Sequence, residues 1–263
     1  MVTDGAYYLD PELYDVVYGD IVADIEPYLA LLRGAASPAL EVCCGNGRLL
    51  VLVRAAGIAC DGLDLDPRML AQLREKLAAR SLTATLYEAD MRDFSLPGRY
   101  ALITIPFNSF LHNLTQADQL RTLRCCRHHL ASGGRLVMNV FQPSLAKLLQ
   151  GGDEVLFKQV PRAGGTVKIW DRTVDDHAEQ LRQVHRRVEF LDAAGARTRE
   201  EQVSFSLRYI FKPEMELLLH VAGFPRWEAR PLFTDHAGPA SGSLTLDRPV
   251  REGDVVQWSA WKD

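Results

Sequence analysis

The chain has 263 residues, of which 47% are hydrophobic and 24% charged, and its formal net charge is −4 at pH 7. This length allows one large domain with a sizeable core, and the mildly acidic balance gives no electrostatic reason to expect a nucleic-acid or membrane partner. The sequence shows neither an apolar run of membrane-spanning length nor a basic-then-apolar leader, so a cytoplasmic location is the expectation. The 5 cysteines include two adjacent pairs, which fit neither a secreted disulfide framework nor a metal site.

The N-terminal stretch predicts helical structure with aromatic residues on one face. Residues 7–33 are rich in tyrosine and run as helix through residues 21–32. Tyr14 and Tyr18 are four residues apart, so they share a helical face. Two interpretations remain open. The rings either pack the helix onto a sheet, or they contact a bound ligand through their faces and hydroxyls.

A glycine-containing turn joins a strand to the helix that follows it. Residues 39–42 predict a short buried strand and residues 49–56 a helix, with Gly45 and Gly47 in the turn. Glycine permits positive φ and close approach of the backbone to a ligand, while the helix start presents unpaired N–H groups. The pattern predicts a site for a carboxylate or phosphate, although such turns also serve purely structural roles.

The next two strands each lead into an acidic residue. Residues 59–63 lead to Asp64, which lies about 20 residues beyond the glycines and suits the diol of a ribose. A third strand over residues 83–88 precedes Asp90 and Met91. The Asp90 carboxylate can accept a hydrogen bond from an exocyclic amine, and the Met91 backbone can face a purine edge. Together these residues indicate a nucleoside-binding edge.

The segment after the fourth strand is the first place to seek a bound substrate. Residues 100–105 predict a buried strand that ends at Pro106. Ligands of open α/β sheets bind beyond the carboxyl ends of the strands, so the following residues should border the reacting group. Asn108 either orients an acceptor or caps the next turn. His112 either takes a proton or is a half-buried structural histidine.

The rest of the α/β pattern follows in order. Thr115 and Asp118 predict a capping box for a helix to Leu130, which Gly133 and Gly134 would end. The other predicted elements are a fifth strand over residues 135–141, a short helix over 143–150, a helix over 212–222, and an antiparallel pair over 227–233 and 255–261.

A different pattern occupies the region before the helix over residues 212–222. Apolar and polar residues alternate there, which is typical of half-exposed antiparallel strands, and residues 192–195 predict a hairpin turn. Residues 153–211 are therefore expected to form an inserted antiparallel cap, which would cover the acceptor site if the chain is a group-transfer enzyme. Arg208 and Tyr209 are its most suggestive residues, with solvent exposure of the first and core packing of the second as alternatives.

Four segments resemble, in order and spacing, the motifs of the class I S-adenosylmethionine-dependent methyltransferases. The resemblance extends over residues 7–141 and implies an α/β fold with a doubly wound, Rossmann-like, mostly parallel seven-stranded sheet. Cys43 departs from the family, since it stands where the family usually has the first glycine of its loop. The four segments are Leu-Glu-Val-Cys-Cys-Gly-Asn-Gly-Arg at 40–48, Gly-Leu-Asp-Leu-Asp-Pro-Arg-Met-Leu at 62–70, Glu-Ala-Asp-Met-Arg-Asp-Phe at 88–94 and Gly-Gly-Arg-Leu-Val-Met at 133–138.

The resemblance also implies S-adenosyl-L-methionine as the cofactor and a set of site residues. In similar small-molecule methyltransferases the N-terminal segment closes over the cofactor, which adds its two tyrosines to the set. Tyr18 and His112 are the expected catalytic residues. The expected substrate-binding residues are Asn108, His112, Arg208, Tyr209 and, in a long Gly-, Ser- and Pro-rich loop, His236. The expected cofactor-binding residues are Tyr14, Tyr18, Glu41, Cys43, Gly45, Asn46, Gly47, Arg48, Asp64, Leu65, Met69, Asp90, Met91, Arg92, Pro106 and Phe107.

The function implied by the resemblance is methyl transfer to a small-molecule acceptor. The reaction is an in-line displacement, so the protein supplies mainly alignment, and nitrogen is the favoured acceptor atom because an amine need only arrive deprotonated. The alternatives are an O-methyltransferase with His112 or a tyrosine as base, a nicotinamide-dependent dehydrogenase, and a cofactor-binding regulator without transfer activity. Residues 1–152 and 212–263 would form the cofactor-binding domain and residues 153–211 the cap, with a homodimer through the cap as a further expectation.

Overall fold

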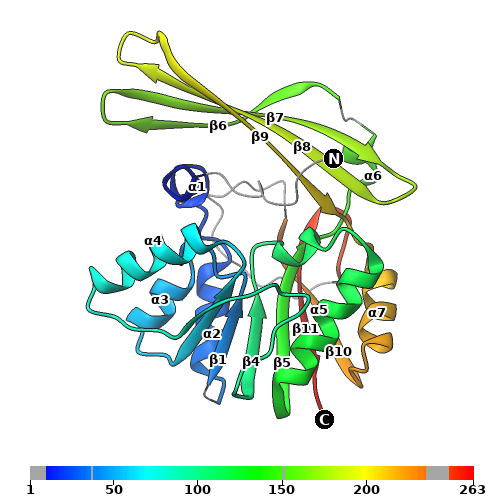
Figure 1. Ribbon diagram of the computed structural model, residues 1–263. Coiled ribbons are helices and arrows are strands. Elements are labelled where there is room, and N and C mark those ends of the chain that lie inside the picture. Colours follow the sequence, from blue (N-terminus) through cyan, green and yellow to red (C-terminus); the bar gives the residue numbers. More distant parts are fainter. Residues whose placement is uncertain (1–9, 37, 150–151, 235–248) are drawn as a thin grey trace. The chain divides into compact units, whose positions relative to one another are not determined.

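The computed structural model describes residues 10–36, 38–149, 152–234 and 249–263. They form two compact units (Figure 1). The α/β unit consists of the described residues within 21–143 and 210–263, and the antiparallel unit consists of the described residues up to 20 and within 144–209. The segment before residue 21 therefore groups with the antiparallel strands, although the sequence-based division places it in the cofactor-binding domain.

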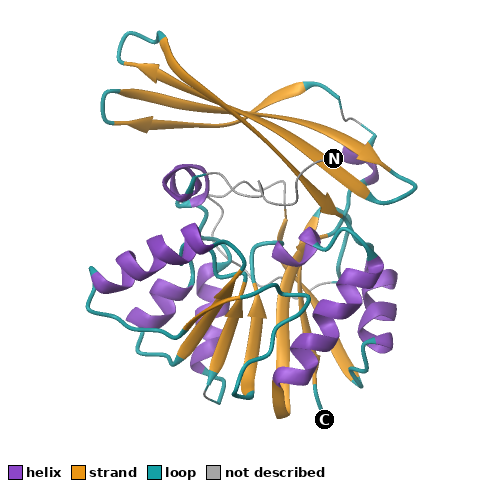
Figure 2. Ribbon diagram, in the orientation of Figure 1, coloured by secondary structure: helices purple, strands orange, loops and turns teal. Residues whose placement is uncertain are grey.

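A seven-stranded sheet forms the centre of the α/β unit (Figure 2). Its strands are β1 (Ala39–Val42), β2 (Cys60–Asp64), β3 (Leu86–Glu88), β4 (Tyr100–Ile105), β5 (Leu130–Phe141), β10 (Arg226–Thr234) and β11 (Asp254–Trp261). The order is β10-β11-β5-β4-β1-β2-β3, in which β1 to β5 pair in parallel and β11 pairs antiparallel with both neighbours. Because β1 has β2 on one side and β4 on the other, the strand order reverses there, which is where such sheets bind ligands.

Helices cover this sheet through their apolar faces. Tyr28, Leu50 and Leu73 belong to one buried cluster together with Leu102 and Val137 of the sheet, so three successive helices pack on it. None of the described helices is long and apolar enough to cross a membrane. The helices of this unit are α2 (Ile25–Arg33), α3 (Leu50–Ala55), α4 (Pro67–Ala78), the 3-10 helix η1 (Ser109–His112), α5 (Gln116–His129) and α7 (Lys212–Val221).

The doubly wound seven-stranded sheet confirms the predicted fold class. The predicted boundary between the helix α5 and the strand β5, however, was wrong. Gly133 and Gly134 lie inside β5 instead of ending the helix, which stops at His129. The pairing of β4 with β5 shifts register between Tyr100 and Leu102, and a Cβ on Gly134 would lie 3.0 Å from the Tyr100 carbonyl oxygen. The glycines therefore permit an irregularity in the strand where the two backbones approach closely.

The N-terminal helix prediction also needs correction. The tyrosines lie on a separate helix, α1 (Pro11–Tyr18), and α2 begins only at Ile25. The Gly19 N–H group caps α1 by donating to the Asp15 carbonyl, and the chain leaves the helix after it. A glycine directly after a helical segment, such as Gly19, commonly marks the end of the helix. The prediction followed the spacing of the tyrosines and overlooked this glycine.

The antiparallel unit is a four-stranded sheet with order β6-β7-β8-β9, joined by hairpins. Its elements are α1, the short helix α6 (Leu145–Leu148), β6 (Glu154–Arg162), β7 (Gly165–Asp176), β8 (Leu181–Asp192) and β9 (Arg197–Arg208). The predicted hairpin turn is confirmed: Asp192 N–H donates to the Ala196 carbonyl, and Gly195 has φ 85°. β9 ends at Arg208, so the predicted alternation through residue 211 extends beyond the strand.

The helix α1 packs on one face of the four-stranded sheet. Leu13 and Val17 are buried in a cluster with Val167, Ile169 and Val188. This packing explains why the N-terminal residues belong to the antiparallel unit. The helix that carries Tyr14 and Tyr18 thus packs on the antiparallel sheet.

Candidate functional site

The turn after β1 has the conformation that its glycines predict. Gly45 has φ 53° and Gly47 has φ 89°, values that favour glycine. A Cβ on Gly47 would lie 2.3 Å from Cδ1 of Leu73 and 2.9 Å from Cγ2 of Val51, so this position also needs glycine for close packing. A Cβ on Gly45 would meet nothing within 4 Å. Gly47 therefore holds the turn against α4, while Gly45 leaves open space beside the backbone.

Asp64 lies at the end of β2 and ties that strand to the glycine turn. Its Oδ2 accepts a hydrogen bond from the Gly45 N–H group at 2.7 Å, and its Oδ1 accepts one from the Asp66 N–H group at 2.9 Å. Burial raises the pKa of Asp64 to about 6, against the effect of these hydrogen bonds. The carboxylate is thus fixed at the carboxyl edge of the sheet, as its predicted role requires.

Cys43 occupies the left-handed conformation that the missing glycine would adopt. Its φ is 59°, and its thiol lies 3.6 Å from Sδ of Met91. Burial raises the pKa of the Cys43 thiol well above its ordinary value, so the side chain stays neutral and weakly nucleophilic. The loop therefore keeps the backbone shape expected of a glycine at this position.

Glu41, on β1, is a buried acid with unused hydrogen-bonding capacity. It is 2% exposed, and its Oε2 has no hydrogen-bond partner among the described residues. Burial raises the pKa of Glu41 to about 8, against the favourable charge of Arg48. Asn46, in the turn, is also buried and donates to Oε1 of Gln72 at 2.7 Å. A buried acceptor without a partner is expected to receive a donor from a ligand.

Arg48 connects the glycine turn to two other segments. Its guanidinium donates to both carboxylate oxygens of Asp24, at 2.8 and 2.5 Å, and to the Ile21 carbonyl at 2.7 Å. The same guanidinium lies 4.2 Å from the ring centroid of Phe107. The bidentate ion pair with Asp24 therefore fixes Arg48 directly after the glycine turn.

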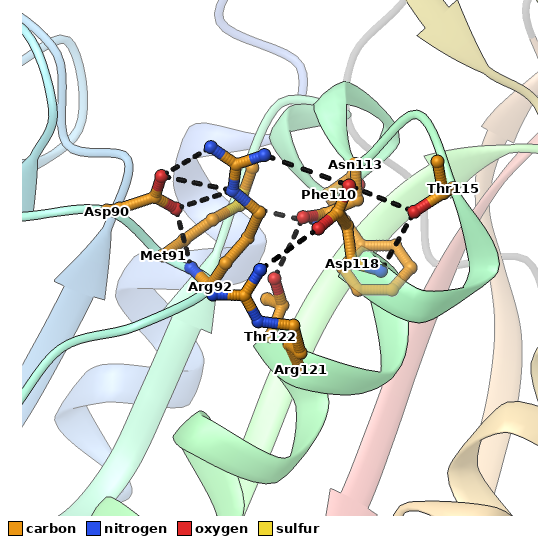
Figure 3. A network of polar contacts seen from close by, with 9 residues as sticks. All are labelled: Asp90, Met91, Arg92, Phe110, Asn113, Thr115, Asp118, Arg121 and Thr122. Atoms are coloured by element: carbon orange, nitrogen blue, oxygen red, sulfur yellow. Dashed lines mark hydrogen bonds and ion pairs between the residues drawn. The ribbon is translucent and has the colours of Figure 1, made fainter.

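The segment after β3 is held by an ion network (Figure 3). Arg92 donates to both oxygens of Asp90, at 3.0 and 2.6 Å, and lies 3.7 Å from Asp118 at the start of α5. Burial raises the pKa of Asp90, but the hydrogen bonds from Arg92 outweigh it and leave the pKa below its ordinary value. The Asn113 amide lies 3.6 Å from Sδ of Met91. These contacts fix the predicted purine-facing backbone.

The segment after β4 contains two consecutive residues with positive φ, Phe107 at 59° and Asn108 at 61°. Phe107 N–H donates to Oδ1 of Asn139 at 2.8 Å. Oδ1 of Asn108 accepts from Phe141 N–H at 2.8 Å, and the side chain makes no capping hydrogen bond to η1. The side-chain capping interpretation of Asn108 was therefore wrong, because its amide binds the backbone of β5 instead.

The remaining predicted site residues of the α/β unit differ in how far they are exposed to solvent. His112 is half-buried at the end of η1, and Pro106 is buried at the end of β4. Leu65 is 53% exposed after β2, whereas Met69 is fully buried on the inner face of α4. Leu65 is therefore open to a ligand, whereas Met69 is closed to solvent.

In the antiparallel unit, Tyr18 is bound by a buried arginine. Its hydroxyl accepts from Arg186 at 2.5 Å, and the ring centroid lies 4.9 Å from that of Tyr14. Arg186 is 3% exposed and also donates to both oxygens of Asp171, at 2.7 and 2.6 Å. Tyr18 thus packs α1 onto the sheet through a charged hydrogen bond, which supports the packing interpretation of this residue.

Arg208 and Tyr209 join the β7–β8 turn to the end of β9. Arg208 is only 5% exposed and donates to Oε1 of Gln180 at 2.9 Å, so the solvent-exposed alternative was wrong. Tyr209 is 2% exposed, and its hydroxyl lies 3.2 Å from Nδ1 of His177. Its core packing is therefore combined with a polar contact. His236 lies outside the described residues.

The structure therefore brings the turn after β1, Asp64, the Asp90 segment and Phe107 together at one sheet edge, all within the α/β unit. Tyr14, Tyr18, Arg208 and Tyr209 belong to the other unit. Among the described residues, no group of three or more His, Cys, Asp or Glu side chains has the arrangement of a metal site.

Sequence reasoning missed two polar features. Asn139 interrupts the apolar run of β5, and a polar residue in a buried strand is a signal for a specific hydrogen bond. Arg186 lies two residues from both Val184 and Val188, on the apolar side of an alternating strand, and so requires a buried partner such as Asp171. Neither signal identifies the partner without the strand pairing.

Comparison with known proteins agrees with this geometry. Residues 39–134 match the family model described as a methyltransferase domain. A dTDP-3-amino-3,6-dideoxy-alpha-D-glucopyranose N,N-dimethyltransferase from Streptomyces fradiae is 32% identical over 134 residues, which are 48% of this chain and 51% of that protein. The chain thus spans about half the length of the curated relatives that it matches.

Solved structures share the fold over nearly the whole chain. DesVI from Streptomyces venezuelae has a TM-score of 0.73 and 22% identity, and the alignment covers 98% of this chain and 100% of that one. CalS10, an amino pentose methyltransferase from Micromonospora echinaspora solved with S-adenosylmethionine, has a TM-score of 0.70 and 23% identity, with 98% of each chain covered. Residues 39–134 are thus similar to a methyltransferase domain, and the chain shares its fold with solved S-adenosylmethionine-dependent methyltransferases.

Proposed function

We propose that this protein transfers the methyl group of S-adenosylmethionine to the amino nitrogen of a small molecule, and that the acceptor is a nucleotide-linked amino sugar. The relative from Streptomyces fradiae is named for N,N-dimethylation of a dTDP-linked amino sugar, and CalS10 is described as an amino pentose methyltransferase. These names support the proposed acceptor class. The α/β unit supplies the independent argument for the cofactor.

The observation that carries the cofactor assignment is the set of ligand-ready groups around the glycine turn. The space beside Gly45 is open, Asp64 is fixed at the end of the next strand, and Oε2 of Glu41 is buried without a partner among the described residues. S-adenosylmethionine presents a ribose diol and an ammonium group, which are hydrogen-bond donors. Two buried carboxyl groups beside an open turn therefore fit it.

Alignment is the main catalytic contribution that these residues can make. When bound, S-adenosylmethionine supplies a methyl group on a sulfonium, which is already activated for in-line displacement. The backbone turn around Cys43 and Gly45 is rigidly set by positive φ values and by the hydrogen bond to Asp64. An amine acceptor needs only its lone pair in line with the methyl group, so the reaction fits a site built for orientation.

We further infer that the antiparallel unit selects the acceptor. The residues proposed for the adenine, ribose and ammonium groups all belong to the α/β unit. Replacing residues 153–211 by a Gly/Ser linker should keep the affinity for S-adenosylhomocysteine within about tenfold while abolishing transfer. A linker variant that folds, binds S-adenosylhomocysteine and methylates the acceptor at the parent rate would contradict this inference.

A matched pair of acceptors tests the proposed reaction. The purified protein is incubated with S-adenosylmethionine and either a dTDP-3-amino-dideoxyhexose or its 3-hydroxy counterpart, and products are identified by mass spectrometry. The amino compound should gain one or two methyl groups and the hydroxy compound none. Methylation of the hydroxy compound alone would indicate an O-methyltransferase. Binding of cofactor without transfer to any amine would indicate a regulator.

A further inference from the structure

A buried amide on β5 joins two elements at the carboxyl edge of the sheet. Asn139 is 2% exposed, and its Oδ1 accepts two hydrogen bonds of 2.8 Å each, one from the Tyr28 hydroxyl on α2 and one from the Phe107 N–H group after β4. A backbone N–H can only donate, so the side-chain oxygen must face it. The orientation of the amide is therefore determined by its partners.

This amide holds a strained piece of backbone. Phe107 and Asn108 are consecutive residues with φ near 60°, a conformation that side-chain-bearing residues rarely adopt and that persists only where surrounding contacts impose it. Asn139 fixes the first residue, and the Phe141 N–H group fixes the second through Oδ1 of Asn108. Both contacts come from the last residues of β5. The end of this strand therefore determines the path of the chain after β4.

The ring of Phe107 is held as well as its backbone. The Arg48 guanidinium lies 4.2 Å from the ring centroid, and Arg48 itself is part of the segment that begins with the glycine turn. The contacts of Phe107 therefore couple the expected cofactor turn to the segment after β4. Strained backbone that is fixed from several sides is typical of functional positions.

We propose that Asn139 is a positioning residue for methyl transfer, which holds Phe107 and Asn108 where they align the acceptor amine with the methyl group. This inference rests on the proposed function. Asn139 does not itself need to touch cofactor or acceptor. Its loss should therefore lower kcat more than it changes the affinity for either, because misplacement by about 1 Å can reduce turnover about a hundredfold.

Two substitutions of Asn139 separate positioning from packing. Asn139→Leu keeps a similar shape without an acceptor, whereas Asn139→Asp keeps an acceptor oxygen. We expect Asn139→Leu to lower kcat by about 10- to 100-fold while the Kd for S-adenosylhomocysteine changes by less than about threefold, and Asn139→Asp to recover much of the lost kcat. Hydrogen exchange of the Phe107 amide should become faster in Asn139→Leu, which reports the hydrogen bond without reference to activity.

A pair of tyrosine substitutions keeps the test informative if Asn139→Leu does not fold. Tyr28→Phe removes one donor to Asn139, and Tyr100→Phe removes a comparable buried hydroxyl that donates to Asp61 at 3.1 Å near the starts of β4 and β2. Tyr28→Phe should lower kcat several-fold, while Tyr100→Phe should leave kcat within about twofold.

The failure of this inference differs from that of the proposed function. Absence of transfer by the parent protein to every amine tested would remove the reaction, and with it any role of Asn139 in that reaction. Equal kcat in the parent and in Asn139→Leu, with altered thermal stability alone, would show that Asn139 is only structural. Equal kcat losses in Tyr28→Phe and Tyr100→Phe would also overturn the assignment.

Discussion

The Arg48 guanidinium lies 4.2 Å from the centroid of the Phe107 ring while it forms a bidentate ion pair with Asp24. One side chain thus links the glycine turn after β1, the approach to α2 and the segment after β4. The ion pair is buried, with 9% and 2% of the two side chains exposed. Because a buried pair is fixed in geometry, the position of the arginine over the ring is fixed too.

Separating Arg48 from Phe107 should weaken cofactor binding cooperatively. Arg48→Lys loses the planar fork, and Phe107→Leu loses the ring face. In a double-mutant cycle on the Kd for S-adenosylhomocysteine, measured by calorimetry, we expect a coupling energy of about 1 kcal/mol. Arg226→Lys is the control, since this arginine lies 4.0 Å from the Trp261 ring centroid in the β10–β11 pair. Additive effects would show that the contact does not couple the two segments.

Cys43→Gly should preserve or improve cofactor affinity. A residue with a side chain at φ 59° is strained by about 1–2 kcal/mol, and the glycine removes this strain. Glycine also loses about 0.5–1 kcal/mol more backbone entropy on folding, which offsets part of the gain in stability. The free energy of unfolding should therefore change by no more than about 1.5 kcal/mol. Cys43→Val, which puts a branched side chain at the same φ, should destabilise by about 1–3 kcal/mol. Loss of S-adenosylhomocysteine binding in Cys43→Gly would show that the thiol takes part in binding.

Much of the cofactor edge could be predicted because its determinants are local. The turn with Gly45 and Gly47 follows from residues adjacent in sequence, and the place of Asp64 follows from the end of a strand whose neighbour is known from the doubly wound order. The bond between Asn139 and Phe107 depends on how β4 pairs with β5. Their register includes a shift that no local pattern specifies.

The same distinction explains the errors outside the cofactor edge. The helical spacing of Tyr14 and Tyr18 was correct, but it contained no information on which sheet would receive their face. Arg208 appeared exposed because arginine usually is, and only the hairpin pairing of β8 with β9 brings Gln180 to it. Long-range pairing therefore determines which polar residues become buried.

The stability of the protein should fall as the pH rises, partly because of Glu41. Its pKa is raised from an ordinary value of 4.5 to about 8, so between these values the native state binds more protons than the unfolded state. That contribution is complete below the unfolded pKa and is lost as the pH approaches 8, at a rate on the order of 1 kcal/mol per pH unit. Asp64 acts in the same direction up to about pH 6.

Glu41→Gln isolates this contribution above pH 6. Urea unfolding between about pH 6 and 8 should show a steeper loss of stability in the parent than in Glu41→Gln. Glu88→Gln, an exposed acid at the end of β3, should follow the parent. Parallel pH profiles for the parent and Glu41→Gln would exclude Glu41 as a buried titrating group.

Proton release on binding S-adenosylhomocysteine near pH 7.5, seen by calorimetry in two buffers, is expected when its ammonium pairs with Glu41.

Asp171→Asn should strongly destabilise the antiparallel unit. It removes the carboxylate from a pair in which the Arg186 and Asp171 side chains are 3% and 13% exposed, and it leaves a buried guanidinium charge unpaired. Breaking such a pair costs about 3–5 kcal/mol. Glu201→Gln, in an exposed pair with Arg199, should cost at most about 1 kcal/mol. Equal unfolding free energies for the two variants, measured with urea, would contradict the buried role of Arg186.

The most direct test of the cofactor site is calorimetric titration of Asp64→Ala with S-adenosylhomocysteine. We expect a loss of about 2–4 kcal/mol, or roughly a 30- to 1000-fold increase in Kd, because hydrogen bonds from the ribose to a charged acceptor are removed. Asp61→Ala, at the other end of β2, is the matched control and should bind within about threefold of the parent. Affinity in Asp64→Ala equal to that in Asp61→Ala, with both proteins folded, would contradict the assignment of this sheet edge as the S-adenosylmethionine site.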